Sequence, residues 1–98
     1  MKYFVSYTTK DEEITIDFLK SIADLLQKTG KVFIDLLNND SIDKQKRIFD
    51  EIDSCDLLLV IETQNVYKSK WVNSEIARAK NKNIPIQKIS PVIFLLNQ

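Results

Sequence analysis

The stretch Leu57-Leu58-Leu59-Val60-Ile61 is the most apolar run in the chain, and it decides what the fold can be. Five apolar residues in succession are typical of a strand that is buried on both faces. Shorter runs of the same kind stand at Tyr3-Phe4-Val5 and at Val32-Phe33-Ile34. We therefore predict an α/β fold with a parallel sheet covered by helices, in which residues 57–61 form the central strand.

A helical pattern separates the first two strands. Between Ile14 and Leu26, apolar residues recur at spacings of three and four, which is typical of one apolar helix face. Thr9 and Glu12 have the spacing of a capping box, so we predict that this helix begins near them. Gly30, the only glycine, is predicted to end the helix in a left-handed conformation.

Two more helices and a further strand are predicted after the second strand. The residues from Leu36 to Asp43 are expected to form a loop, in which Ser41 or Asp43 can cap a helix. One face of that helix carries Ile48, Phe49 and Ile52. Another helix follows the central strand and ends at 81–83. Residues 84–86 and 91–96 then supply one or two further strands, whose boundary the two prolines obscure.

The predicted sheet indicates where a ligand would bind. In open parallel sheets, ligands bind at the carboxyl ends of the strands, where the strand order reverses. In the commonest small parallel α/β sheets, the strand order reverses between the first and third strands. The residues expected there are Ser6, Tyr7, Thr8 and Thr9 after the first strand, and Glu62, Thr63 and Gln64 after the third.

The composition excludes several classes of function. The 98 residues suit one small domain over residues 1–98. Its 14 basic and 14 acidic residues cancel, so a nucleic acid is not an expected partner. The chain has no histidine, which removes Ser-His and Cys-His pairs and most zinc sites, and no metal is expected. A single glycine cannot build a glycine-rich phosphate loop.

The cysteine content and the hydropathy pattern bear on the compartment. Cys55 is the only cysteine, and we interpret it as a small buried residue in a reducing environment. The apolar run at the N-terminus breaks at Ser6, which is too early for a signal peptide. No apolar run approaches the length of a membrane span, so we expect a cytoplasmic protein that does not bind a membrane.

One carboxylate stands out on the helix that follows the central strand. One face of that helix is apolar and carries Val72, Ile76 and Ala79. Glu75 falls at the border of this face, with Trp71 on the same side. A half-buried carboxylate beside an indole would hold a well-positioned charge. The alternative is a surface ion pair between Glu75 and Arg78, and spacing alone favours neither. Trp71 by itself is more typical of a packing residue.

Four stretches of the chain, taken in order, resemble the Toll/interleukin receptor (TIR) domain family, and its bacterial members in particular. They are Phe4-Val5-Ser6-Tyr7 with Lys10-Asp11-Glu12, residues 48–61, residues 67–76, and Asn83-Ile84-Pro85-Ile86. The third stretch contains the family's Ser-x-Trp pattern at Ser69 and Trp71, with Glu75 four residues after the tryptophan. The similarity runs in register over most of the chain.

The resemblance implies a fold, a reaction and a site. The family has a flavodoxin-like three-layer sandwich, with a parallel sheet in the order 2-1-3-4, possibly with a fifth strand, and helices on both faces. Many of its members cleave the nicotinamide–ribose bond of NAD⁺, which is their substrate, without a metal or a further cofactor. The family's catalytic glutamate matches Glu75. Its substrate cleft maps onto Ser6, Tyr7, Thr8, Asp35 and Trp71.

The resemblance also implies a partner. In the family, the loop after the second strand mediates head-to-tail assembly, and it maps onto Asn38, Asn39, Asp40 and Ser41. Here that loop lacks the family's usual glycine and proline. The expected partner is a second copy or another TIR domain. Family members usually continue through another helix and strand beyond the position of Gln98, so the chain resembles a short or C-terminally truncated form.

Three functions stay open at this point. The first is an NAD⁺ glycohydrolase or cyclase in bacterial immunity or signalling, which the spacing of Trp71 and Glu75 favours. The second is a non-catalytic module that acts by self-association or by binding another TIR domain. The third is an enzyme similar to nucleoside deoxyribosyltransferases, which also place a glutamate near a ribosyl carbon. A fold alone does not choose among them.

Overall fold

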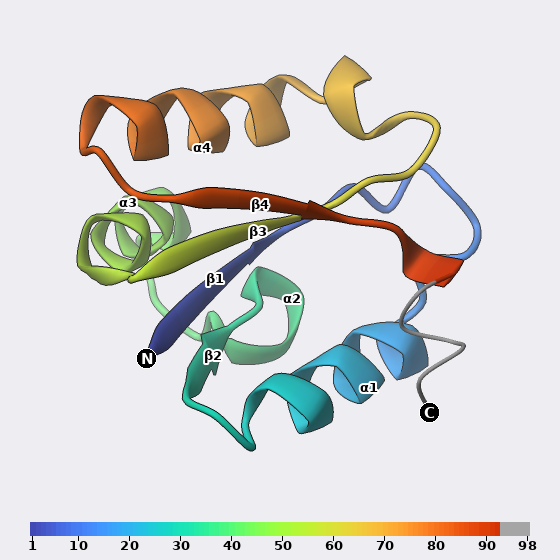
Figure 1. Cartoon of the computed structure of the whole chain (residues 1–98). Helices are drawn as coiled ribbons and strands as arrows, with labels where there is room; N and C mark the ends of the chain where they lie inside the picture. Colours follow the sequence, from blue (N-terminus) through green and yellow to red (C-terminus); the bar gives the residue numbers. More distant parts are fainter. Residues whose placement is uncertain (93–98) are drawn as a thin grey trace.

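The computed structural model describes residues 1–92 and contains one parallel sheet between two layers of helices (Figure 1). The strands are β1 (Lys2–Ser6), β2 (Lys31–Phe33), β3 (Leu57–Ile61) and β4 (Ile86–Ile89). The helices are α1 (Ile16–Leu26), α2 (Asp35–Asn38), α3 (Lys44–Ser54) and α4 (Lys70–Asn81), with a short 3₁₀ helix, η1 (Val66–Lys68).

The strand order is β2-β1-β3-β4, and every neighbouring pair is parallel. In the register, Phe4 lies beside Phe33 on one side and beside Leu58 on the other. This arrangement confirms the predicted parallel sheet, with residues 57–61 as an inner strand. α1 and α2 lie on one face of the sheet, while α3 and α4 lie on the other (Figure 1).

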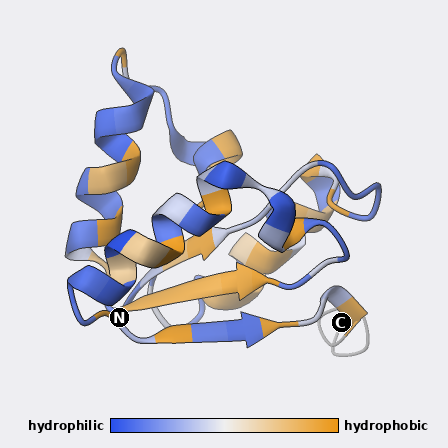
Figure 2. Cartoon of the chain, turned by 90° about the horizontal axis from the view of Figure 1, so that it is seen from above, coloured by the Kyte–Doolittle hydropathy of each residue, from blue (hydrophilic) through white to orange (hydrophobic). Residues whose placement is uncertain are grey.

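The two faces of the sheet bury two separate hydrophobic clusters, which explains the continuous apolar runs. Phe4, Leu58 and Val60 pack towards α3 and α4. Val5 and Ile61 pack towards α1 on the opposite face. Successive residues of a strand point to opposite faces, so a strand covered on both sides needs apolar residues at every position. The outer strand β4 carries hydrophilic residues in its middle (Figure 2).

The first helix differs from its prediction at both ends. α1 begins after Thr15, whose hydroxyl accepts a hydrogen bond from the Phe18 N–H at 3.1 Å, so the predicted start near Thr9 and Glu12 is wrong. Its C-cap is Gln27, and no glycine in the described residues has a positive φ. The requirement for glycine at position 30 is steric instead, because a Cβ there would collide with the Met1 carbonyl.

The remaining elements largely follow the sequence pattern. Of the two candidate caps for α3, Asp43 serves, because its Oδ1 accepts a hydrogen bond from the Lys46 N–H at 3.0 Å. The predicted loop after β2 instead begins with the short helix α2. α4 ends at Asn81 as predicted, and Asn83 then adopts a left-handed conformation with φ 59°. The strand predicted over residues 84–86 is shifted towards the C-terminus, because β4 spans Ile86–Ile89. Of the strand predicted over residues 91–96, only residues 91 and 92 are described, and they are helical rather than extended.

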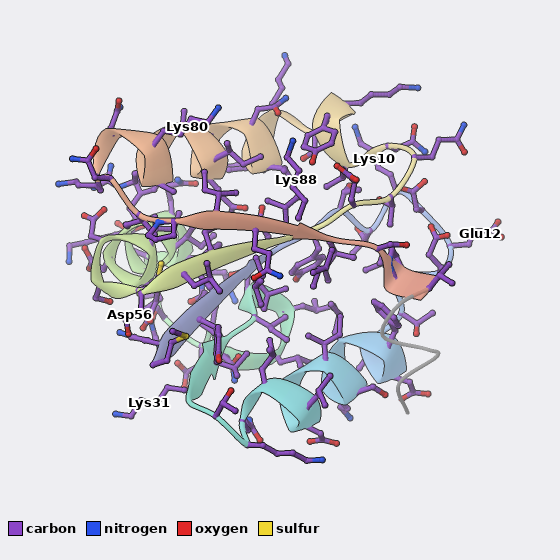
Figure 3. The ribbon with its side chains drawn as sticks, in the orientation of Figure 1. Lys10, Glu12, Lys31, Asp56, Lys80 and Lys88 are labelled. Atoms are coloured by element: carbon purple, nitrogen blue, oxygen red, sulfur yellow. The ribbon has the colours of Figure 1, made fainter. Side chains whose placement is uncertain are left out.

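Charged side chains project from several sides of the molecule, as the labelled residues in Figure 3 illustrate. Within residues 1–92, no helix is long and apolar enough to cross a membrane.

Cys55 is buried in the cluster beneath α3 and α4, and burial raises the pKa of its thiol. This environment matches the interpretation of Cys55 as a small packing residue.

Candidate functional site

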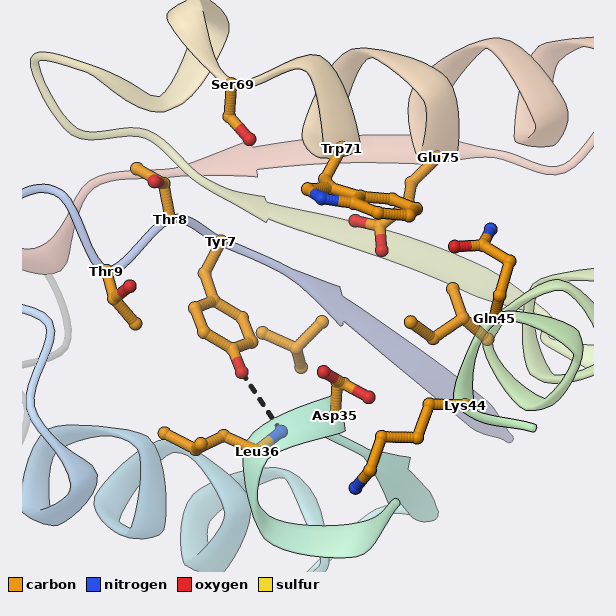
Figure 4. A pocket seen from close by; sticks show the side chains of 12 residues that line it. Tyr7, Thr8, Thr9, Asp35, Leu36, Lys44, Gln45, Ser69, Trp71 and Glu75 are labelled. Atoms are coloured by element: carbon orange, nitrogen blue, oxygen red, sulfur yellow. Dashed lines mark hydrogen bonds between the residues drawn. The ribbon is translucent and has the colours of Figure 1, made fainter. Parts of the chain in front are cut away.

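A cavity of about 560 Å³ opens beside the carboxyl end of β1 (Figure 4). Parts of the chain that are distant in sequence meet there, namely the residues that follow β1 and the first turns of α2, α3 and α4. The lining residues are Val5, Tyr7, Thr8, Thr9, Asp35, Leu36, Lys44, Gln45, Ile48, Ser69, Trp71 and Glu75. The cavity therefore forms at the edge of the sheet where a parallel α/β fold is expected to bind a ligand.

The loop after β3 is not part of this cavity, although the sequence predicted that it would be. Glu62, Thr63 and Gln64 are absent from the lining residues. Glu62 accepts a hydrogen bond from the Tyr67 hydroxyl at 2.6 Å instead. The chain continues past the cavity through η1, and only Ser69 and the first turns of α4 return to it.

α4 holds Glu75 inside the molecule. The helix begins at a cap, where the Ser69 hydroxyl accepts a hydrogen bond from the Val72 N–H at 3.3 Å. Val72 and Ala79 are fully buried, and they fix the helix face that also carries Glu75. Glu75 is 8% exposed, so it is more deeply buried than its predicted place at the border of the face. Its Oε1 accepts a hydrogen bond of 2.8 Å from the Ser6 hydroxyl at the end of β1.

The alternative interpretation of Glu75, an ion pair with Arg78, is wrong. Arg78 donates two hydrogen bonds of 2.8 Å to the carboxylate of Asp53 on α3. Its guanidinium also lies 4.4 Å from the centre of the Phe49 ring. The arginine therefore links α4 to α3 on the outer side, and the Glu75 carboxylate faces the cavity without it.

The environment of Glu75 favours the protonated form more than water does. Burial raises the pKa of Glu75 from its ordinary value of 4.5 to about 7. The hydrogen bond from Ser6 opposes this effect, and the negative charge of Asp35 adds to it. Near neutral pH the carboxyl group therefore exists in both forms, as is common for a carboxyl group that takes part in catalysis.

Tyr7 and Asp35 form the wall of the cavity opposite α4. The Tyr7 hydroxyl accepts a hydrogen bond from the Leu36 N–H at 3.0 Å, which ties the end of β1 to the start of α2 (Figure 4). Burial raises the pKa of Tyr7 to about 12, so its hydroxyl stays neutral. Asp35 is the first residue of α2, and its Oδ1 accepts a hydrogen bond of 2.7 Å from the Asn39 side chain.

Trp71 is not the packing residue that its isolated position in the sequence suggested. Its side chain lies in the first turn of α4 and is 60% exposed. The indole lines the cavity beside Glu75 (Figure 4). A large aromatic face that is open to solvent at the mouth of a cavity can stack against a planar ring or a cation.

The structure brings most of the predicted site residues together. Tyr7, Thr8, Asp35, Trp71 and Glu75 line the cavity. Ser6 does not line it, since it is 1% exposed and lies beneath Glu75 as the donor of its hydrogen bond. The binding and catalytic roles of these residues stay predictions.

The loop predicted to mediate assembly is held largely by its own polar groups. The Asn38 side chain accepts a hydrogen bond from the Ile34 N–H at 2.8 Å. Asn39 is buried, and its side chain accepts a hydrogen bond from the Ser41 N–H at 3.2 Å. Asp40 is exposed and lies 3.8 Å from Arg47. The Asp40 side chain is therefore open to a partner, and a role of the loop in assembly stays a prediction.

Sequence reasoning missed the contribution of α3. Lys44 and Gln45, in the first turn of this helix, line the cavity together with Ile48. A signal for them existed in the sequence, because Asp43 was a candidate cap and the residues after a cap form the first turn.

Residues 1–92 contain no group of three or more His, Cys, Asp or Glu residues that could hold a metal ion.

Comparisons with known proteins place this geometry in a family. The family model of the TIR domain matches residues 4–98, which include every residue that lines the cavity. A search of curated proteins finds no match.

Proposed function

The chain belongs to the TIR domain family, and from this premise we propose that it is an NAD⁺ nucleosidase, a glycohydrolase or cyclase with Glu75 as its catalytic carboxylate. One observation carries the proposal. A buried carboxylate, held by Ser6, opens into a cavity that an exposed tryptophan borders. Among the lining residues, Glu75 is the buried acid, and Asp35 is the second carboxylate.

The reaction suits a site of this composition. In the first step, the bond between the ribose carbon and the nicotinamide nitrogen breaks, and its electron pair stays on the nitrogen. Nicotinamide leaves as a neutral molecule, so no acid has to protonate it, in contrast to an ordinary glycosidic oxygen. The ribose becomes positively charged in the transition state. The Glu75 carboxylate can stabilise that charge, and it can orient the ribose hydroxyls.

The second step needs an acceptor for the ribosyl carbon. Water adds to this carbon in a glycohydrolase and loses a proton, whereas a nucleophile on the adenine side of the same molecule adds in a cyclase. Glu75, with its pKa raised by burial to about 7, can accept the proton that is released. The neutral Tyr7 hydroxyl on the opposite wall can hold a ribose hydroxyl or the incoming water.

The charges around the cavity suit the substrate. The nicotinamide ring of NAD⁺ carries a positive charge while it is attached to ribose. Glu75 and Asp35 are acidic, and the exposed face of Trp71 can stack on a cationic ring. NAD⁺ is thus proposed as a substrate, with no cofactor beside it.

Assembly is the second part of the proposal. TIR domains generally interact with other TIR domains. For this chain we propose homo-oligomers or contacts with another TIR domain through the loop around Asp40, within bacterial immunity or signalling in the cytoplasm.

The test is nicotinamide release from NAD⁺ by the wild type and by Glu75→Gln. The exposed acid Glu12 provides a matched control, because Glu12→Gln makes the same chemical change at a residue that does not line the cavity. We expect the wild type and Glu12→Gln to release nicotinamide, and a folded Glu75→Gln to release none. A folded wild type that is inert towards NAD⁺ at high protein concentration would favour a non-catalytic interaction module instead.

A further inference from the structure

The inward face of α3 begins with a polar residue where its pattern calls for an apolar one. Gln45 lies three residues before Ile48 and seven before Ile52. At about 100° per residue these positions share one side of the helix. Ile48 and Ile52 are both buried in the core. Residues that break a local pattern of this kind concentrate at functional sites.

The Gln45 side chain lies in the cavity and has no partner within residues 1–92. It is half-buried, lines the cavity and extends from α3 towards Glu75 and Trp71, with no hydrogen bond marked to it (Figure 4). The lysines on either side differ, since the Lys44 ammonium donates to the Asn39 carbonyl at 2.8 Å and that of Lys46 donates to Asp50 at 3.0 Å. A carboxamide carries both donors and an acceptor, so Gln45 is equipped to bind a polar ligand group.

We propose that Gln45 binds the carboxamide of the nicotinamide ring and selects substrates that carry it; this inference rests on the proposed function. If Glu75 lies at the ribose carbon, the ring attached to that carbon is one bond away and lies in the space beside Trp71. Gln45 reaches into the same space from α3. Two carboxamides can pair through reciprocal N–H···O hydrogen bonds, and each then satisfies the other.

The same geometry disfavours the acid analogue of NAD⁺, nicotinic acid adenine dinucleotide, in which a carboxylate replaces the carboxamide. A carboxylate only accepts hydrogen bonds, so the acceptor oxygen of Gln45 would lose its partner. The carboxylate of the acid analogue would also bring a negative charge close to Glu75 and Asp35. The site should therefore cleave NAD⁺ in preference to nicotinic acid adenine dinucleotide, and a cationic residue at position 45 should weaken that preference.

The experiment measures kcat/KM for both dinucleotides. We expect Gln45→Leu, which continues the apolar face of α3, to lose about tenfold to a hundredfold with NAD⁺. The loss with the acid analogue should be smaller. Gln45→Arg should shift the preference towards the acid analogue by at least tenfold, because a guanidinium pairs with a carboxylate. Gln64→Leu makes the same change at an exposed residue outside the cavity and should leave both values unchanged.

The outcomes separate this inference from the function on which it rests. A wild type that cleaves neither dinucleotide overturns the proposed function and the role of Gln45 together. A wild type that cleaves NAD⁺, with Gln45→Leu and Gln45→Arg showing the wild-type preference between the two dinucleotides, overturns the role of Gln45 alone. Equal losses with both dinucleotides in Gln45→Leu would also contradict it, since a merely structural residue would act on both alike.

Discussion

Replacing Glu75 with glutamine should make the protein more stable at alkaline pH while it removes the activity. The folded state holds the Glu75 proton more tightly than the unfolded state, because burial raises the pKa from 4.5 to about 7. Ionisation of this group therefore costs stability, which falls as the pH rises from about 4.5 through about 7. Glutamine stays neutral throughout, so the Glu75→Gln variant avoids this loss.

The size of the effect follows from the two pKa values. One pKa unit corresponds to about 1.4 kcal/mol, so complete ionisation of Glu75 costs about 3 kcal/mol of folding free energy. Between about pH 5 and about pH 8, the wild type should lose about 2 to 3 kcal/mol of folding free energy relative to Glu75→Gln. Proteins commonly sacrifice stability in this way to hold a charged group in a functional site.

Urea unfolding at a series of pH values measures this difference. The free energy of unfolding is determined for the wild type, for Glu75→Gln and for the exposed control Glu12→Gln. We expect the wild type and the control to run in parallel, and Glu75→Gln to gain on both as the pH rises. Parallel curves for all three proteins would refute the reasoning, because they would show that Glu75 ionises in the folded protein as it does in the unfolded chain.

Three further predictions concern the pH dependence and the substrate. Ser6→Ala removes the hydrogen bond that lowers the pKa of Glu75, so the acid limb of the pH–rate profile should move up by up to about one pH unit. Asp35→Asn removes a negative charge that raises this pKa, and the same profile should move to lower pH. Trp71→Ala should raise the KM for NAD⁺ about tenfold. Because Trp71 is 60% exposed, the midpoint of thermal unfolding should change little. An unshifted pH–rate profile in both Ser6→Ala and Asp35→Asn would contradict the control of the Glu75 pKa by these two residues. An unchanged KM in Trp71→Ala would contradict the binding role of Trp71.

The sheet could be predicted from the sequence because its signal is local and redundant. A strand covered on both faces needs apolar residues throughout, and Leu57 to Ile61 satisfy that requirement. The start of α1 was harder to predict, since Thr9 and Thr15 can both cap a helix and the choice depends on tertiary packing. The role of Gly30 depends on contact with the Met1 carbonyl, which is distant in sequence.

In the site too, features set by one segment could be predicted from the sequence, whereas features set by packing between segments could not. Glu75 could be found because its helix face and its spacing from Trp71 are properties of one segment. The exposure of Trp71 and the pairing of Arg78 with Asp53 depend on how α3 packs against α4, which periodicity does not specify. Gln45 was missed for a related reason. The cap at Asp43 places it in the first turn of α3, but the sequence does not specify that this turn borders the cavity.

The central claim is that Glu75 catalyses the cleavage of NAD⁺. Nicotinamide release by the wild type and by Glu75→Gln, followed over a range of protein concentrations, tests it most directly. The account predicts release by the wild type, with a rate per protein molecule that rises with concentration as TIR domains assemble, and no release by a folded Glu75→Gln. A folded wild type that releases no nicotinamide at any concentration, or a Glu75→Gln variant as active as the wild type, would contradict it.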